Sequence, residues 1–210
     1  YAEIRQLPDA TGDSVPLVLV NRVAAEKGFH SVTIDHHRAA RSAMEYLVAL
    51  GHRRIALVSG DAQADHIKPR HQAYLDVLAE NGIRPEPGWM LENLAWNGEQ
   101  RKAQIASLLS QHKPTAFFLP TGRFEAAVLV TLHQLGCSIP GDISLASFDD
   151  VPNPLHPLVP LMTTVRLPLA SLGQSAVRLL DRVRRDRPEF PIVETLETEL
   201  VVRDSCKRLR

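Results

Sequence analysis

The sequence has little of several things that define common protein classes. Only two of its 210 residues are cysteine, Cys137 and Cys206, which argues against a disulfide-stapled scaffold and favours a reducing compartment. Lysine plus arginine and aspartate plus glutamate both number 24, so the chain lacks the net positive charge that attracts DNA phosphates. No apolar run approaches the roughly 18 residues of a membrane span. We therefore expect a cytoplasmic protein that does not associate with membranes.

Signatures of catalysis are also missing. The sequence has no G-x-S-x-G elbow, no G-x-x-x-x-G-K-[ST] phosphate loop and no G-x-G-x-x-G fingerprint after a strand. Two histidine pairs, His36 with His37 and His66 with His71, are poor metal ligands, because adjacent side chains diverge and positions five apart do not share a helix face. We expect no enzyme activity, no metal and no cofactor.

Short β-branched or aromatic runs alternate with longer amphipathic stretches along the chain. This order is typical of β-α-β units around a mostly parallel sheet, so it predicts an α/β fold. Gly51, Gly82 and Gly136 each follow an apolar-periodic run as a helix C-cap does, and Asn97 is placed to open a helix. We expect strands at residues 15–20, 32–34, 54–59, 90–94, 115–119, 143–148, 163–166 and within 193–202, and helices at 39–50, 69–81, 98–111, 124–135 and 169–185.

Functional side chains follow the ends of four predicted strands. They are His66 and Arg70, Trp96, Thr121, and Asp149. Open parallel sheets bind ligands outside the carboxyl ends of their strands, so these residues are expected to meet at one edge of the sheet. A guanidinium, an aromatic plate, a hydroxyl and a carboxylate together suit a polyhydroxylated ligand such as a sugar, a polyol or a nucleoside.

Each of these residues also has an ordinary explanation. Arg70 can form an exposed ion pair, Trp96 can fill the core, Asp149 can serve a turn or cap, and Thr121 can be plain turn chemistry. Their shared position after successive strands favours the joint interpretation. Under it, Arg70→Ala and Asp149→Ala each abolish most ligand binding and leave the fold intact.

Three stretches of the chain closely resemble the LacI/GalR family of transcriptional regulators in order and spacing. They are residues 50–56 (LGHRRIA), residues 139–150 (IPGDISLASFDD), and residues 161–165 (LMTTV) with Leu172-Gly173. The resemblance covers almost the whole chain. Periplasmic sugar-binding proteins share the implied fold, but the Gly-His-Arg-Arg-Ile and Pro-Gly-Asp-Ile-Ser stretches are similar to the regulators specifically.

The resemblance implies two doubly wound parallel-sheet subdomains of periplasmic-binding-protein type I architecture, with a ligand in the cleft between them. The first would take residues 1–59 plus about 165–190, and the second residues 60–164 plus about 191–210. By position, Arg70 matches the family's effector-contacting arginine, Trp96 its aromatic platform and Asp149 its cleft aspartate. His66 has a first-turn position that also touches ligand in some relatives.

The chain departs from the family at Thr121-Gly122, where relatives usually carry Asn-Asp. The side-chain amide that commonly contacts the effector is therefore absent, and we expect an altered ligand. The resemblance also implies a homodimer formed partly through Ala126, Val130 and His133, on one face of the helix at 124–135. Packing of these positions on the sheet is the alternative.

The chain opens at Tyr1 without an initiator methionine, and two strands and one helix before Gly60 are too few to close a doubly wound sheet. We therefore expect a fragment whose first subdomain is N-terminally incomplete, and whose operator DNA is bound by a helix-turn-helix head outside this sequence. Three functions stay open. The effector-sensing core of a regulator is favoured over a periplasmic-type sugar receptor for transport or chemosensing, and over an unrecognised α/β enzyme.

Overall fold

The computed structural model describes residues 16–22, 28–60, 64–150 and 161–209. The chain divides into two compact units, one of Tyr1–Asp35 with Pro168–Glu197 and one of His36–Leu167 with Thr198–Arg210. It therefore passes between the units after residues 35, 167 and 197. Within the described residues, no helix is long and apolar enough to cross a membrane.

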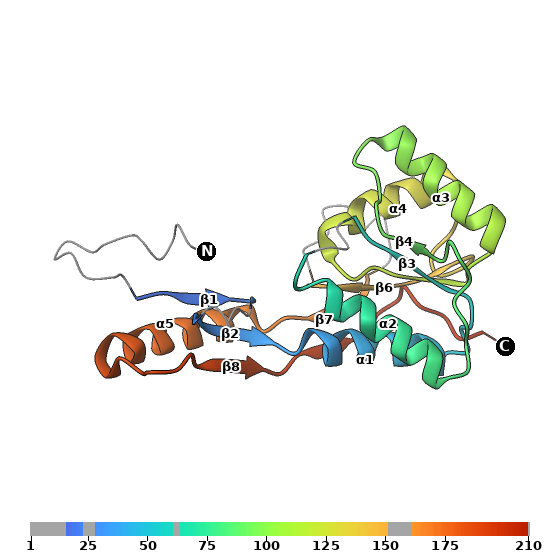
Figure 1. Ribbon diagram of the computed structural model, residues 1–210. Helices are drawn as coiled ribbons and strands as arrows, with labels where there is room; N and C mark the ends of the chain where they lie inside the picture. The colour runs from blue at the N-terminus through green and yellow to red at the C-terminus, as the bar shows by residue number, and fades with distance from the viewer. Residues whose placement is uncertain (1–15, 23–27, 61–63, 151–160, 210) are drawn as a thin grey trace. The chain divides into compact units, whose positions relative to one another are not determined.

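The first unit is built on a small parallel sheet. Its strands lie in the order β1 (Val18–Val20), β2 (His30–Ile34) and β8 (Val193–Leu196). The helix α5 (Leu169–Asp186) packs on all three strands and is labelled beside them in Figure 1. Its buried residues recur at helical spacing and form one stripe, apolar except for a serine: Leu172, Ser175, Leu179 and Val183.

The second unit is built on a six-stranded sheet. The strand order is β4 (Met90–Leu91), β3 (Ile55–Val58), β5 (Ala116–Phe118), β6 (Ser144–Phe148), β7 (Thr163–Arg166) and β9 (Glu199–Val201). The first five strands are parallel, and β9 runs antiparallel to β7. Every residue of β3, β5 and β6 is buried, as expected for parallel strands that are covered on both faces.

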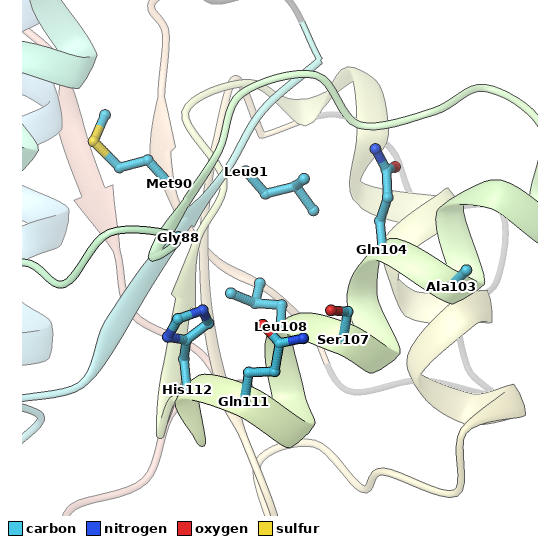
Figure 2. Close-up of a pocket in the computed structure, with 9 residues that line it drawn as sticks. All are labelled: Gly88, Met90, Leu91, Ala103, Gln104, Ser107, Leu108, Gln111 and His112. Carbon is cyan, nitrogen blue, oxygen red and sulfur yellow. The ribbon is translucent and has the colours of Figure 1, made fainter.

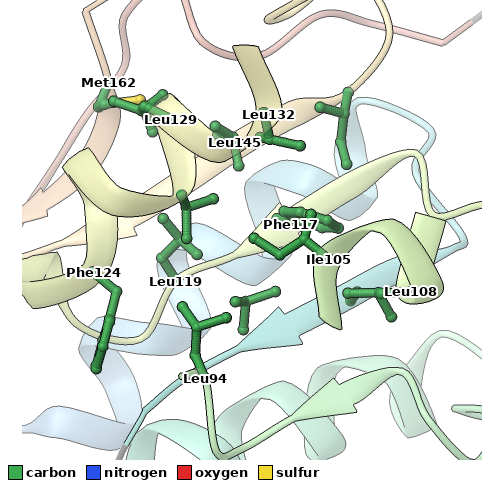
Figure 3. Packing of buried hydrophobic residues seen from close by; sticks show 14 residues of the cluster. Leu94, Ile105, Leu108, Phe117, Leu119, Phe124, Leu129, Leu132, Leu145 and Met162 are labelled. Atoms are coloured by element: carbon green, nitrogen blue, oxygen red, sulfur yellow. The ribbon is translucent and has the colours of Figure 1, made fainter. Parts of the chain in front are cut away.

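Helices cover both faces of this second sheet. Figure 1 shows α1 (His36–Ala49) and α2 (Lys68–Glu80) on one face, and α3 (Gly98–His112) and α4 (Glu125–Gln134) on the other. Apolar side chains from α3, α4 and the sheet interdigitate in one cluster, including Ile105, Phe117 and Leu132 (Figure 3). The carboxyl ends of the strands are thereby held in fixed positions at one edge.

The expected α/β fold is confirmed, and the elements agree closely with the predicted ones. The three capping glycines have left-handed φ angles of 93°, 67° and 73° at Gly51, Gly82 and Gly136. The Asn97 side chain accepts hydrogen bonds from the backbone N–H groups of Glu99 and Gln100 at the start of α3. One expectation differs: the single strand predicted within 193–202 is two strands, β8 and β9, which belong to different sheets.

The unit boundaries also differ from the expected ones. Residues 36–59 lie in the second unit rather than the first, because β3 pairs with β4 and β5 and α1 packs on α2. Residues 191–197 lie in the first unit, because β8 pairs with β2. Strand pairing between distant parts of the chain sets these boundaries, and local sequence does not encode it.

Candidate functional site

The guanidinium of Arg70 is buried at the start of α2, where Pro69 occupies the first turn. The side chain is 1% exposed. Its Nη1 donates to the carbonyl oxygen of Pro120 at 2.6 Å and to Oδ1 of Asp149 at 3.4 Å. Its Nε and Nη2 lie 3.3 and 3.1 Å from Nδ1 of His36, and its Cζ lies 3.6 Å from the centroid of the Phe148 ring. Arg70 is therefore not an exposed ion pair.

Burial lowers the pKa of Arg70 to about 10, and the carboxylate of Asp149 opposes this effect. A pKa in this range still leaves the guanidinium charged at neutral pH. Because its partners hold it in one orientation, Arg70 is a fixed cation at the carboxyl end of the sheet. A side chain held in this way loses little conformational entropy if it takes part in binding.

Asp149 follows β6 with a left-handed φ of 84°, a conformation that aspartate adopts more readily than most residues. Its backbone N–H donates to the carbonyl oxygen of Val165 at 2.9 Å. Its Oδ2 accepts from the hydroxyl of Thr121 at 3.3 Å and from the N–H of Gly122 at 3.0 Å, while Oδ1 faces Arg70. The carboxylate thus joins the ends of β5 and β6 to α2.

Asp150 has a second left-handed φ, 49°, and its side chain goes elsewhere. Arg203 approaches both carboxylate oxygens, at 2.7 and 3.1 Å, and Nε of Arg166 donates to Oδ2 at 2.7 Å. Arg203 and then Arg166 hold the pKa of Asp150 below its ordinary value, against the effect of burial. The two adjacent carboxylates therefore have separate roles: Asp150 ties β7 to the C-terminal segment, and Asp149 faces Arg70.

Trp96 is 61% exposed, so it does not fill the core. Its ring centroid lies 4.6 Å from that of Phe124, and Cζ of Arg123 lies 4.7 Å from the Trp96 centroid. The Phe124 ring packs against the backbone of Gly60, where an added Cβ would lie 2.0 Å from the ring. Trp96 thus packs against the Phe124 ring, and that ring lies where it does because residue 60 is a glycine.

The five predicted site residues are brought together to different degrees. Arg70, Asp149 and Thr121 form one bonded group. His66 is half-buried, and its ring centroid lies 6.1 Å from that of His36, the histidine that contacts Arg70. Trp96 contacts the residues that follow Thr121. That these side chains bind a ligand stays a prediction.

Sequence reasoning missed the groups that surround these residues. His36 opens α1 directly after β2, and Phe148 looks like an ordinary core residue of β6. The strand-end rule applied to β2 would have found His36. No local signal identifies Phe148 as the ring beneath Arg70, because that contact joins residues far apart in the sequence.

A separate pocket of about 470 Å³ lies in the second unit between the edge strand β4 and α3. Figure 2 shows Gln104, Ser107 and Gln111 of α3 across from Met90 and Leu91. His112, at its other end, lies 3.5 Å from the carboxylate of Glu86. The pocket contains none of the predicted site residues and forms no part of the site described above.

Residues 44–206 match the model of a family described as a periplasmic binding protein-like domain. This match covers well over half of the chain, and it agrees with parallel strands whose carboxyl ends carry the polar group around Arg70. The fold and the match define the class as a ligand-binding domain of the periplasmic-binding-protein type.

Solved and curated relatives narrow this class. A LacI family transcriptional regulator from Mycobacterium smegmatis is 30% identical, with a TM-score of 0.77 over 92% of this chain and 71% of that one. A complex of the transcriptional regulator CelR with cellobiose is 28% identical, with a TM-score of 0.74 over 86% of this chain and 55% of that one. The chain belongs to the LacI family of transcriptional regulators.

A curated relative can be compared with this chain in length. The HTH-type transcriptional repressor PurR of Serratia proteamaculans is 30% identical over 183 residues, which are 86% of this chain and 53% of the repressor. The chain thus spans about half the length of this relative. The predicted LacI/GalR resemblance is confirmed.

Proposed function

We propose that this chain is the effector-binding and dimerisation core of a transcriptional regulator. It binds a small polyhydroxylated metabolite without changing it chemically, and binding alters the affinity of the whole regulator for operator DNA. The observation that carries this proposal is the bonded group of Arg70, Asp149 and Thr121 at the carboxyl ends of parallel strands. A regulator that acts on operator DNA works in the cytoplasm, and we propose that location.

The chemistry of this group supports recognition of a polyol or sugar. A carboxylate accepts from hydroxyls, a guanidinium donates to them, and a threonine hydroxyl does both. The side chain of Asp149 is 27% exposed while that of Arg70 is 1% exposed, so a ligand reaches the carboxylate first. Cellobiose in the CelR complex is a ligand of this kind.

The helix α4 supports the dimer. Val128, Leu129 and Leu132 are buried in the core, whereas Val130 is 38% exposed and His133 is exposed. Ala126 is half-buried, between the two faces. We assign Ala126, Val130 and His133 to a symmetric contact between two copies, and operator contact to the whole regulator, because these 210 residues carry no net charge.

The test is a thermal-shift screen of sugars, polyols and nucleosides on the 210-residue chain, followed by calorimetric titration of each compound that stabilises it. We expect a bound compound to be recovered unchanged by mass spectrometry. Asp149→Ala should abolish most of its binding, whereas Arg84→Ala, which alters an exposed arginine outside this group, should not. Unaltered titration of Asp149→Ala, or conversion of the compound, would overturn the proposal.

A further inference from the structure

Two guanidinium groups contact Trp96, those of Arg101 and Arg123. Arg101 donates from Nη1 to the carbonyl oxygen of Trp96 at 2.9 Å and from Nε to the hydroxyl of Thr131 at 3.1 Å. Arg123 lies over the Trp96 ring, and its backbone N–H donates to the hydroxyl of Thr121 at 3.3 Å. Within the described part of the chain, neither arginine takes part in an ion pair.

Three acidic groups around this part of the site are committed to other partners or buried. Asp149 accepts from Arg70 and from the end of β5, and Asp150 is held by Arg203. Glu125 is 5% exposed, and burial raises its pKa, which favours the neutral carboxyl. Glu99, in the first turn of α3, is exposed, and no ion pair joins it to either arginine within the described residues. The two guanidinium groups therefore outnumber the one exposed carboxylate that follows Trp96 in the sequence.

A neutral sugar does not require this local charge. A guanidinium over an exposed indole is held weakly, because water solvates both groups, and a charge-assisted hydrogen bond to an anion is stronger. Arg123 can therefore leave the ring for an anionic partner at small cost. The same movement uncovers the indole face that a sugar ring would occupy.

We propose that the effector is a sugar-type molecule that carries an anionic group, a phosphate or a carboxylate, and that Arg123 selects for this group. The inference rests on the proposed function for the polyhydroxylated part, which meets Asp149 and Thr121. Arg123 binds the anionic group beside Trp96, and Arg101 adds to the positive potential there. Arg123 is thus a specificity-determining residue that the family resemblance does not assign.

The test is calorimetric titration of the 210-residue chain with matched compounds: a hexose, its phosphate ester and its uronic acid, with inorganic phosphate alone as a fourth probe. Because a charge-assisted hydrogen bond adds about 1.5 kcal/mol or more, at least one anionic compound should bind about tenfold more tightly than the hexose. This preference should shrink at high salt, because the guanidinium is exposed. The phosphate ester and the uronic acid distinguish the two anionic groups.

Arg123→Gln should remove the preference without weakening hexose binding, because the guanidinium no longer covers the Trp96 ring. Arg84→Gln, at an exposed arginine that has no ion pair with any described residue, should retain the preference. Equal binding of neutral and anionic compounds, a preference that persists in Arg123→Gln, or binding of no anionic compound would each overturn the inference. A lower molar mass of Arg123→Gln in light scattering, together with unchanged selectivity, would also overturn it. Arg123 would then belong to a contact between subunits. If a neutral sugar still binds through Asp149, the proposed function stands without this inference.

Discussion

The two sides of the candidate site are built differently. On one side, Arg70 is buried, and its guanidinium contacts His36, Pro120 and Asp149 of the protein itself. On the other side, Trp96 is exposed, and Arg123 lies over its ring and forms no ion pair with any described residue. The first side is fixed before any ligand arrives, whereas the second can rearrange when one does.

This difference follows from the cost of burying charge. A guanidinium removed from water must be paired and hydrogen-bonded, so the buried side carries its own carbonyl, imidazole and carboxylate partners. An exposed arginine has no such requirement, because water solvates it. We therefore expect the buried side to set the geometry of binding, and the exposed side to set which ligand is preferred.

Arg70→Ala, on the buried side of the site, should have the largest effect on both stability and ligand affinity. It removes one partner of a buried ion pair and leaves the Pro120 carbonyl unpaired, which should destabilise the fold by about 3–5 kcal/mol. Ligand affinity should fall by one to two decades, for a loss of roughly 1.5–3 kcal/mol. Urea unfolding and calorimetric titration measure the two effects.

The structure thereby revises the expectation that Arg70→Ala leaves the fold intact. Asp149→Asn is the matched variant, because asparagine tolerates the left-handed φ of 84° and still accepts from the N–H of Gly122. It should weaken binding with less loss of stability than Arg70→Ala. Equal unfolding midpoints for Arg70→Ala and the parent would show that the buried contacts contribute nothing to the fold.

Gly60→Ala should disturb the exposed side of the site by displacing the ring that packs against Trp96. The new Cβ would lie 2.0 Å from the Phe124 ring, so the ring that underlies Trp96 must move. Overpacking of this kind costs about 1–3 kcal/mol. We expect a lower unfolding midpoint in urea and an altered Trp96 emission spectrum in the absence of ligand.

The control for this variant is Gly173→Ala, because nothing lies within 4 Å of the position that its Cβ would take. Alanine in the interior of α5 should stabilise the chain by about 0.5–1 kcal/mol. If Gly60→Ala were as stable as the parent, with an unchanged spectrum, the close packing between Gly60 and Phe124 would not position Trp96.

Trp96→Phe should have a smaller effect, on ligand affinity. Phenylalanine keeps an apolar plate but loses area and the indole, so affinity should fall by up to about tenfold, the equivalent of 1.4 kcal/mol. The change in tryptophan fluorescence on binding should disappear in Trp96→Phe and survive in Trp89→Phe, since Trp89 is 4% exposed. A signal that follows Trp89 instead would remove the stacking role of Trp96.

Much of the fold was predictable because its signals are local. Glycine caps and apolar periodicity located the helices, and the strand-end rule selected Arg70, Thr121 and Asp149, which the structure joins by hydrogen bonds. The strand-end rule also selected Trp96, but this residue packs against Phe124 and Arg123.

The rest depends on contacts between distant residues. Whether β3 belongs to the first or the second unit is decided by its pairing with β4 and β5. The burial of Arg70 depends on the Phe148 ring, 78 positions along the sequence. Periodicity and motif spacing describe neighbours along the chain, so neither feature could be predicted from them.

Glu125→Gln should have the smallest effect, and one that depends on pH. Burial is the main cause that raises the pKa of Glu125 above its ordinary value of 4.5, with Asp150 and Asp149 adding to it and Ser147 and Arg203 opposing it. The folded chain therefore retains this proton at pH values where the unfolded chain has lost it. The resulting contribution to stability is complete below the unfolded pKa and is lost as pH rises through the folded pKa.

Glutamine has no proton to lose, so the free energy of unfolding of Glu125→Gln should lack this decline. The difference between variant and parent should grow in favour of the variant as pH rises above the ordinary pKa of 4.5, measured by urea unfolding at several pH values. Glu99→Gln, at an exposed position, should run parallel to the parent. A constant difference for Glu125→Gln would mean that Glu125 is ionised in the folded chain, and its negative charge would then offset part of the positive charge beside Trp96.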